Sequence, residues 1–170
     1  RLTLMYAVTM YIGGIPLIYL GDELAALNEY AYRNDPAKKS DSRWVHRVKQ
    51  DQESFKRRNK EGTAEHQIFS NIKKLIGIRT AYEDFEADQT HFHDTGNPHL
   101  FSFSRVQDED CVLFIGNFSE HSLTLGSHFI QHIFGSGHTL ENLWTGEKIQ
   151  VFKELAVDPY QFFVLKRVTD

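Results

Sequence analysis

The sequence predicts an α/β segment followed by an antiparallel all-β segment, from three observations. An apolar run, residues 15–20, is bounded by glycines and followed by Asp22 and Glu23. Apolar residues recur at helical spacing across residues 64–81. After about residue 88, apolar residues come in short runs separated by turns. The first two patterns are typical of alternating α/β folds, and the third is typical of an antiparallel sheet or sandwich.

Residues 1–12 are apolar on nearly all sides, which predicts a buried helix whose partners lie mostly outside this chain. Residues 15–20 are too few for a helix of usual length and predict a strand buried on both faces. Ligands bind at the carboxyl ends of parallel strands, so Asp22 and Glu23 would reach the rim of a site. Because no second strand of this kind follows, we expect the chain to be the C-terminal part of a larger protein.

The polar stretch at residues 24–63 is long for a loop inside a compact domain, and such loops are usually functional or disordered. Its centre, residues 41–47 with the sequence DSRWVHR, is rich in specialised side chains. Thr63 is placed to cap a helix over residues 64–81. The order of helix, buried strand, functional loop and helix predicts the last part of a βα barrel or of a doubly wound sheet.

The second half of the chain predicts short antiparallel strands. A turn at residues 107–110 joins the first two of them into a hairpin. The predicted strands cover residues 99–105, 111–118, 122–125, 138–143, 148–153 and 160–167.

Composition limits the function classes. Residues 1–84 carry 14 Lys and Arg against 11 Asp and Glu, whereas residues 85–170 carry 5 against 12, which predicts a domain boundary near residue 85. Neither half has the strong basic field expected of a nucleic-acid partner. No apolar stretch reaches the ~18 residues of a membrane span. Cys111 is the one cysteine, so an internal disulfide is excluded.

The segment GIPLIYLGDE at residues 14–23 resembles the eighth barrel strand of the α-amylase family, glycoside hydrolase family 13. The segment at residues 41–47, together with Leu27 and Asn28, is similar to amylosucrases and the related sucrose hydrolases. The end of the chain agrees through FIGNFSE at residues 114–120 and through Pro159, Tyr160 and Gln161. The resemblance covers essentially the whole chain.

The resemblance implies the end of a (β/α)8 TIM barrel at residues 1–84 and a C-terminal β-sandwich, known as domain C, at residues 85–170. It implies retaining chemistry, in which one carboxylate attacks the glucosyl carbon of sucrose and a second carboxyl group protonates the departing fructose. In the family these groups come from earlier strands, so we expect no catalytic residue in this chain. The expected partners are a sugar (sucrose and an α-glucan acceptor) and the upstream part of the same barrel, with no nucleic acid and no membrane. No cofactor is expected, and cellular location is left open.

Three residues are candidates for substrate binding. Arg43 matches an arginine that, in amylosucrases, pairs with an upstream Asp and closes the bottom of the glucose pocket; a guanidinium suits this role because it forks onto a carboxylate. Asp22 and Arg47 are the others. Each candidate also has a simpler interpretation. Arg43 could form a surface salt bridge, Asp22 and Glu23 could cap the next turn, and Arg47, with His46, could support neighbouring residues rather than touch the ligand. Family members usually have Pro after the second arginine, whereas Val48 follows here. The following segment, residues 49–60, also differs, which puts loop shape and acceptor choice in question.

Other patterns have simpler interpretations. His91 with His93, and His128 with His132, have spacings that metals use, but neither has the Glu of an HExxH motif, so no metal site is expected. The basic cluster at residues 56–60 has acidic neighbours and is typical of a solvated face. Trp44 is expected to pack under the loop rather than to stack on a sugar. Six phenylalanines are expected in the sandwich core: Phe101, Phe103, Phe114, Phe118, Phe162 and Phe163.

Two classes of function remain open. The first is a sucrose-active enzyme of family 13 that transfers or hydrolyses glucosyl units, or a hydrolase of other α-glucosides. The second is a family member without its catalytic carboxylates, or a structural or carbohydrate-binding module. The upstream gene sequence distinguishes them, because three intact acid motifs would remove the second class.

Overall fold

The structure, a computed structural model, describes residues 1–49, 51–107 and 110–168. The chain forms two compact units, one made of Arg1–Pro16 with Lys74–Asp170 and the other of Leu17–Lys73. The helix α3 (Ala64–Ala81) begins in the second unit and ends in the first. The boundary predicted near residue 85 concerns a barrel and a sandwich rather than these units, and it stays a prediction.

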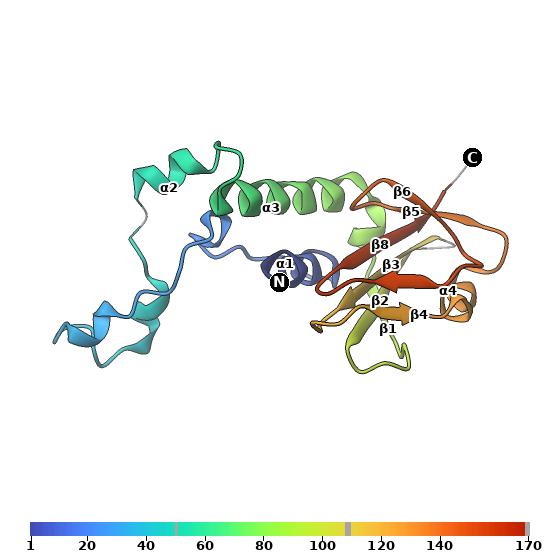
Figure 1. Cartoon of the computed structure of the whole chain (residues 1–170), viewed down its shortest axis with the longest axis horizontal. Helices are drawn as coiled ribbons and strands as arrows, with labels where there is room; N and C mark the ends of the chain where they lie inside the picture. The colour runs from blue at the N-terminus through green and yellow to red at the C-terminus, as the bar shows by residue number, and fades with distance from the viewer. Residues whose placement is uncertain (50, 108–109, 169–170) are drawn as a thin grey trace. The chain divides into compact units, whose positions relative to one another are not determined.

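The first unit is built on a six-stranded antiparallel sheet in the order β1-β2-β3-β8-β5-β6, with a second sheet of β4 and β7 (Figure 1). Strand β2 pairs with β3 from Leu100 opposite Asn117 to Gln107 opposite Asp110. The strands are β1 (Gln89–His93), β2 (Leu100–Gln107), β3 (Asp110–Asn117), β4 (Leu123–Leu125), β5 (Thr139–Asn142), β6 (Glu147–Gln150), β7 (Leu155–Val157) and β8 (Phe162–Arg167). The predicted antiparallel sandwich is therefore confirmed.

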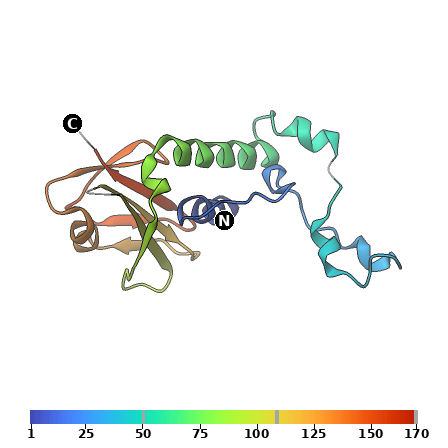
Figure 2. The same cartoon turned by 180° about the vertical axis from the view of Figure 1, so that it is seen from behind.

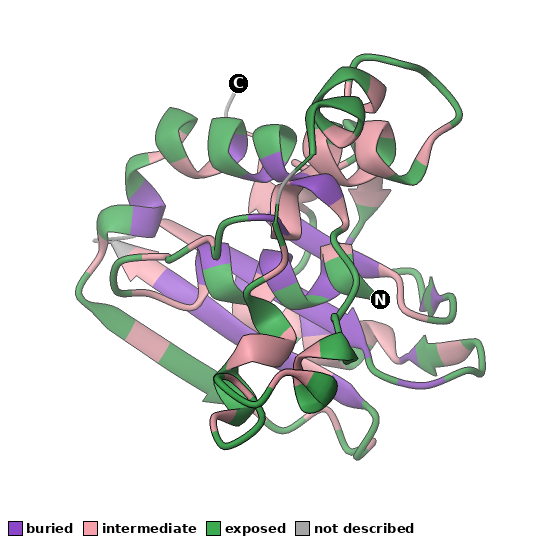
Figure 3. Cartoon of the chain, turned by 90° about the vertical axis from the view of Figure 1, so that its left-hand side faces the viewer, coloured by how far each residue is buried: buried purple, intermediate pink, exposed green. Residues whose placement is uncertain are grey.

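One face of the large sheet packs against the β4–β7 pair and the helix α4 (Ser127–Phe134). Alternation along the strands places apolar side chains on this face. Figure 2 shows this unit from behind, and Figure 3 shows buried residues along the strands of the large sheet. The buried residues of this layer are Leu100, Leu113, Ile115, Leu125, Ile130, Phe134, Leu140, Val151, Leu155, Val157, Phe163 and Leu165.

The opposite face of the sheet is covered by the helix α1 (Leu2–Tyr11) and by the short 3₁₀-helix η4 (Glu83–Glu86). A Cβ atom at Gly116 on β3 would meet Leu4 Cδ1 at 2.9 Å, so α1 lies directly on the strand. The rings of Tyr11 and Phe85 stack with centroids 4.7 Å apart. The Lys166 ammonium group on β8 donates to both carboxylate oxygens of Asp84, at 2.7 and 2.8 Å. Local hydrophobic packing and a nearly buried ion pair thus join this layer to the sheet.

Two arginines hold the carbonyl groups at the C-terminal end of α1. Arg79 donates to the carbonyl oxygen of Met10 and, at 2.8 Å, to that of Gly14. Arg105 donates to the carbonyl oxygen of Ile12 at 3.2 Å. A helix C-terminus leaves unsatisfied carbonyl groups and attracts positive charge, so both arginines are well placed to end this helix. Burial, with Arg79 close by, lowers the pKa of Arg105.

The second unit consists of short helical pieces joined by irregular chain. These are the 3₁₀-helices η1 (Asp22–Leu24), η2 (Ala31–Asn34) and η3 (Ser42–His46), the helix α2 (Gln52–Arg57) and the first part of α3. The predicted cap of α3 is present, because the Thr63 hydroxyl accepts from His66 N at 3.2 Å. None of the helices in the described ranges is both long and apolar enough to cross a membrane.

The structure corrects several element predictions. Within the described ranges residues 15–20 pair with no strand, and the exposed fractions of Ile15, Leu17 and Leu20 are 98%, 81% and 69%. A strand forms only where a partner completes its hydrogen bonds, and the partners were expected outside this chain. The prediction that the partners of residues 1–12 lie mostly outside this chain was wrong in part, because α1 is partly buried within its own unit. Its buried residues are Leu4, Tyr6, Ala7, Met10 and Tyr11.

In the second half of the chain, the strands β1 and β7 and the helix α4 were not predicted. Strand β6 is shorter and begins earlier than expected. Of the six phenylalanines expected in the core, Phe103, Phe114, Phe162 and Phe163 are buried, Phe101 is half-buried, and Phe118 is 40% exposed. The predicted turn at residues 107–110 includes Asp108 and Glu109, which lie outside the described residues.

Candidate functional site

The second unit contains a hollow of about 420 Å³ that brings all three candidate binding residues together. Asp22, Arg43 and Arg47 line it from η1, from η3 and from the residue after η3. The other lining residues are Tyr19, Leu20, Ala26, Leu27, Asn28, His46 and Val48. The hollow thus has apolar walls with a few convergent polar groups, as small-molecule sites usually do.

The chain enters this hollow through a tight turn at Gly21. Gly21 has φ +104°, a left-handed conformation that strongly favours glycine. Glu23 Oε2 accepts from Gly21 N at 2.7 Å, so this acid supports the turn, as the simpler alternative proposed. Asp22 begins η1, and its carbonyl oxygen accepts from Ala25 N at 3.0 Å. Asp22 is half-buried and lines the wall of the hollow.

Arg43 is held by the acid that opens its own loop. Its Nε donates to Asp41 Oδ1 at 2.8 Å and its Nη2 donates to Asp41 Oδ2 at 2.9 Å. Asp41 Oδ1 also accepts from Arg43 N at 3.0 Å, which caps η3. The guanidinium group of Arg43 and this backbone bond hold the pKa of Asp41 below its usual range. Arg47 Nη1 lies 3.8 Å from Asp41 Oδ2, so a single carboxylate orients both arginines.

Hydrogen bonds connect the segment around residue 28 to η3. The His46 ring, through Nδ1, is 3.2 Å from Asn28 Oδ1. Glu29 N donates to the carbonyl oxygen of Val45 at 2.9 Å. These contacts bring Leu27 and Asn28 beside Arg43 in the hollow. The sequence indicated these two residues only through the motif, and Tyr19 was not singled out at all.

Trp44 is half-buried, and two cations lie near its ring system. Lys38 Nζ is 5.0 Å from the centre of a Trp44 ring, and the guanidinium carbon of Arg47 is 5.1 Å from it. Cations over an aromatic face are attracted by its quadrupole. Trp44 therefore also fixes the direction of Arg47, and it lines a neighbouring hollow rather than the one that holds Arg43.

Sequence comparison finds a relative of known activity over most of the chain. No family model matches the chain. The chain is 27% identical over 135 residues to the glucosylglycerate phosphorylase of Escherichia coli K12, covering 78% of this chain and 22% of that protein. Thus the chain spans about a fifth of the length of that relative.

Two solved structures show the same fold at low sequence identity. The trehalose-6-phosphate hydrolase of Bacillus licheniformis has a TM-score of 0.69 and 18% identity, over 99% of this chain and 38% of that one. The α-amylase of Geobacillus thermoleovorans, solved with acarbose, has a TM-score of 0.70 and 14% identity, over 100% of this chain and 33% of that one. The chain therefore has the fold of the last barrel segment and C-terminal β-sandwich of α-amylase-type enzymes.

Proposed function

We propose that this chain is the C-terminal part of a sucrose-active, α-retaining glucosidase or glucosyltransferase of the α-amylase family. Its barrel segment would contribute substrate-binding residues, and its sandwich would support the barrel. The catalytic carboxylates would come from strands that precede residue 1. The chain by itself would then be inactive.

The observation that carries this proposal is the hollow shared by the two motifs. Asp22 comes from the segment at residues 14–23, and Arg43 and Arg47 come from the segment at residues 41–47. These segments are the ones whose sequences resemble sucrose-active members of the family. The likeness to a glucosylglycerate phosphorylase and to a trehalose-6-phosphate hydrolase supports a glucoside as the substrate class.

In this proposal Arg43 closes one end of the glucose pocket. Its guanidinium group would turn from Asp41 to an Asp of the upstream barrel, or would bind both carboxylates at once. A guanidinium group has five N–H donors, so two carboxylates are within its capacity. Asp22 and Arg47 would bind sugar hydroxyl groups, Asp22 as an acceptor and Arg47 as a donor. A pocket closed in this way takes a terminal glucosyl unit and excludes the middle of a long glucan.

A second candidate function is phosphorolysis of an α-glucoside, favoured by the similarity to the glucosylglycerate phosphorylase of Escherichia coli. The first step, transfer of the glucosyl unit from the donor to the enzyme, would be the same as in the first candidate function. The difference is the acceptor, which would be inorganic phosphate instead of water or a sugar. Arg43 and Arg47 line the hollow and could donate hydrogen bonds to phosphate, with Asp22 and the adjacent Asp41 balancing their formal charge.

The test is to give the full-length protein sucrose, with and without inorganic phosphate, and to measure fructose, glucose, glucose 1-phosphate and glucan. Fructose in excess of glucose, with glucan accumulating, supports a transferase. Equal fructose and glucose support a hydrolase. Glucose 1-phosphate that appears only with phosphate supports the second candidate. Absence of fructose under both conditions contradicts sucrose as the donor.

A further inference from the structure

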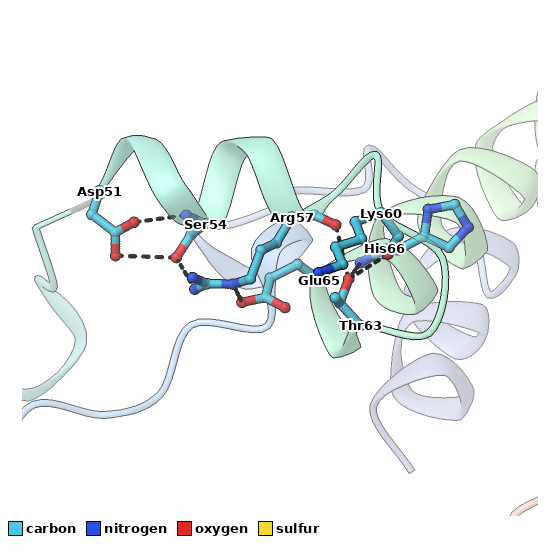
Figure 4. A network of polar contacts seen from close by, with 7 residues as sticks. All are labelled: Asp51, Ser54, Arg57, Lys60, Thr63, Glu65 and His66. Carbon is cyan, nitrogen blue, oxygen red and sulfur yellow. Dashed lines mark hydrogen bonds and ion pairs between the residues drawn. The ribbon is translucent and has the colours of Figure 1, made fainter.

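The segment after Arg47, in which the sequence departs from the family pattern, forms a defined structure. Helix α2 follows Asp51, whose Oδ1 accepts from Ser54 N at 2.6 Å and whose Oδ2 accepts from the Ser54 hydroxyl group at 3.1 Å (Figure 4). This is a helix N-cap, which satisfies a backbone N–H group that the helix leaves open. The residue at which α2 begins is therefore determined by the local sequence.

Arg57 joins α2 to the first turn of α3. Its Nε donates to Glu65 Oε1 at 2.7 Å, and its Nη2 donates to the Ser54 hydroxyl group at 2.9 Å (Figure 4). The Glu65 side chain is only 16% exposed, so this is more than a loose surface pair. We call these four residues, Asp51, Ser54, Arg57 and Glu65, the α2–α3 clasp.

The turn between the two helices is fixed as well. The Thr63 hydroxyl group donates to the carbonyl oxygens of Arg57 and Lys60, each at 2.8 Å, while it accepts from His66 N. The His66 ring, through Nδ1, is 2.9 Å from the carbonyl oxygen of Arg58. Side chains thus bond to both ends of the turn, which adds to the connection that Arg57 makes between α2 and α3.

The clasp forms one wall of a second hollow, of about 490 Å³. The facing wall is the segment from Leu24 to Glu29, which ends the turn after Asp22. Asn28 and Val48 line both this hollow and the one that contains Arg43, as do Ala26 and Leu27, so the two hollows adjoin. The second hollow presents carboxylates, a guanidinium group, an amide and a hydroxyl group, the donors and acceptors that bind sugar hydroxyl groups.

From this arrangement we propose that the second hollow binds the acceptor of the glucosyl unit, a hydroxyl-rich saccharide, and that the α2–α3 clasp positions its wall. The inference rests on the proposed function, because it needs a glucosyl unit to be delivered in the first hollow. Arg57 and Glu65 are positioning residues in this account. Their loss changes how an acceptor binds and leaves cleavage of the donor in place.

The experiment uses the full-length protein with sucrose as donor and maltose as the added acceptor. Arg57→Ala and Glu65→Ala are compared with the charge-swapped pair R57E/E65R. Lys56→Ala is the matched control, because Lys56 pairs with Glu53 on the same helix and both side chains are about two-thirds exposed. The two single variants should raise the KM for maltose by about tenfold or more, the factor that corresponds to the loss of a charge-assisted hydrogen bond.

The rate of fructose release from sucrose alone should match that of the wild type in Lys56→Ala, and in the clasp variants the KM for maltose should change by a larger factor than this rate. The charge-swapped pair should recover part of the lost affinity for maltose, a rescue that a general loss of folding would not give. An unchanged KM for maltose in Arg57→Ala, or an equal rise in Lys56→Ala, overturns the inference. If the alanine variants do not fold, Arg57→Lys and Glu65→Gln are judged by the same criterion.

Failure of the proposed function has a different signature. A wild-type protein that releases no fructose from sucrose contradicts the donor assignment and removes the basis of this inference. If the wild-type protein releases fructose but the KM for maltose is unchanged in the Arg57 and Glu65 variants, only the inference is contradicted.

Discussion

Arg43 and Asp41 form a two-pronged ion pair within one short loop. Nε of Arg43 donates to Oδ1 of Asp41 at 2.8 Å, and Nη2 donates to Oδ2 at 2.9 Å. The pair joins residues two positions apart, so it needs no contact outside this loop. Arg43 lies along the wall of the hollow with its side chain 75% exposed.

The first prediction concerns this arginine. Arg43→Ala in the full-length protein should lower kcat/KM for sucrose by about 100-fold, because an acid that Arg43 pairs with in a closed pocket would remain without its partner. Arg43→Lys keeps the charge but loses the fork, so it should recover little of the activity. The measurement is steady-state fructose release. Arg33→Ala serves as control, since Arg33 does not line the hollow that contains Arg43. Near-normal turnover in Arg43→Ala would contradict the assignment.

The second prediction concerns Asn117, which lies in the segment 114–120 that supported the resemblance. Its Nδ2 donates to the carbonyl oxygens of His121, Val157 and Asp158 at 2.7, 3.0 and 3.0 Å. Its Oδ1 accepts from the backbone and hydroxyl groups of Ser119. The residue is fully buried, so Asn117→Ala should lower the free energy of unfolding by roughly 3 kcal/mol.

Chemical denaturation of the full-length protein measures this loss. Asn97→Ala is the matched control, because Asn97 Oδ1 accepts only the local bond from His99 N. It should cost about 1 kcal/mol or less. Equal losses in the two variants would show that Asn117 does not hold the strand ends together.

The third prediction concerns the ion pair between Lys166 and Asp84. Asp84 is 6% exposed, and Lys166 also lies 3.6 Å from Asp110. Lys166→Met would leave a buried carboxylate without its partner and should lower the free energy of unfolding by about 3 kcal/mol. The double variant K166M/D84N removes the charge as well and should recover a large part of that loss. Urea denaturation provides both values, and a double variant no more stable than the single one would contradict this account.

The fourth prediction is a pH dependence at His93. Burial lowers the pKa of His93, and His91 and His132 nearby add to the effect. The unfolded chain then binds the proton more readily, so neutral His93 contributes stability that is fully present above about pH 6.5 and is lost as pH falls below that value. Its ring, through Nε2, is 2.8 Å from the Ser104 hydroxyl group, a contact that glutamine can reproduce.

His93→Gln should therefore become more stable relative to the wild type on going from about pH 8 to about pH 5.5. Thermal unfolding of both proteins at the two pH values gives the comparison. A difference in melting temperature that does not change with pH would show that His93 does not contribute to acid sensitivity.

Much of the fold follows from local pattern. Helix α3 has the predicted bounds because its apolar spacing is regular and Thr63 caps its start. In strand β2 apolar and polar residues alternate, whereas β3 has a continuous apolar run and is buried from residue 112 to residue 117. Helix α2 was missed because its residues are polar apart from Phe55, and its stability comes from the Asp51 cap and from Glu65, which belongs to another helix. Helix α4 was not predicted, because His128 and His132 were considered only as possible metal ligands and not as residues of a helix.

The remaining differences come from contacts that sequence does not reveal. The burial of α1 needs the sheet that forms about a hundred residues later. Residues 15–20 pair with no strand among the described residues, so the predicted strand does not form. At the candidate site the sequence identified Asp22, Arg43 and Arg47. It did not identify Asp41 as the holder of both arginines, because that role depends on the turn of η3 rather than on any spacing.

The account rests most directly on the reaction of the full-length protein with sucrose, followed by proton NMR from the first minutes. We predict that free fructose appears and that the first glucosyl product has the α configuration, since the glucosyl unit passes through two inversions at one carbon. A first product in the β configuration, or sucrose that stays intact, would contradict the proposed function of the site around Arg43.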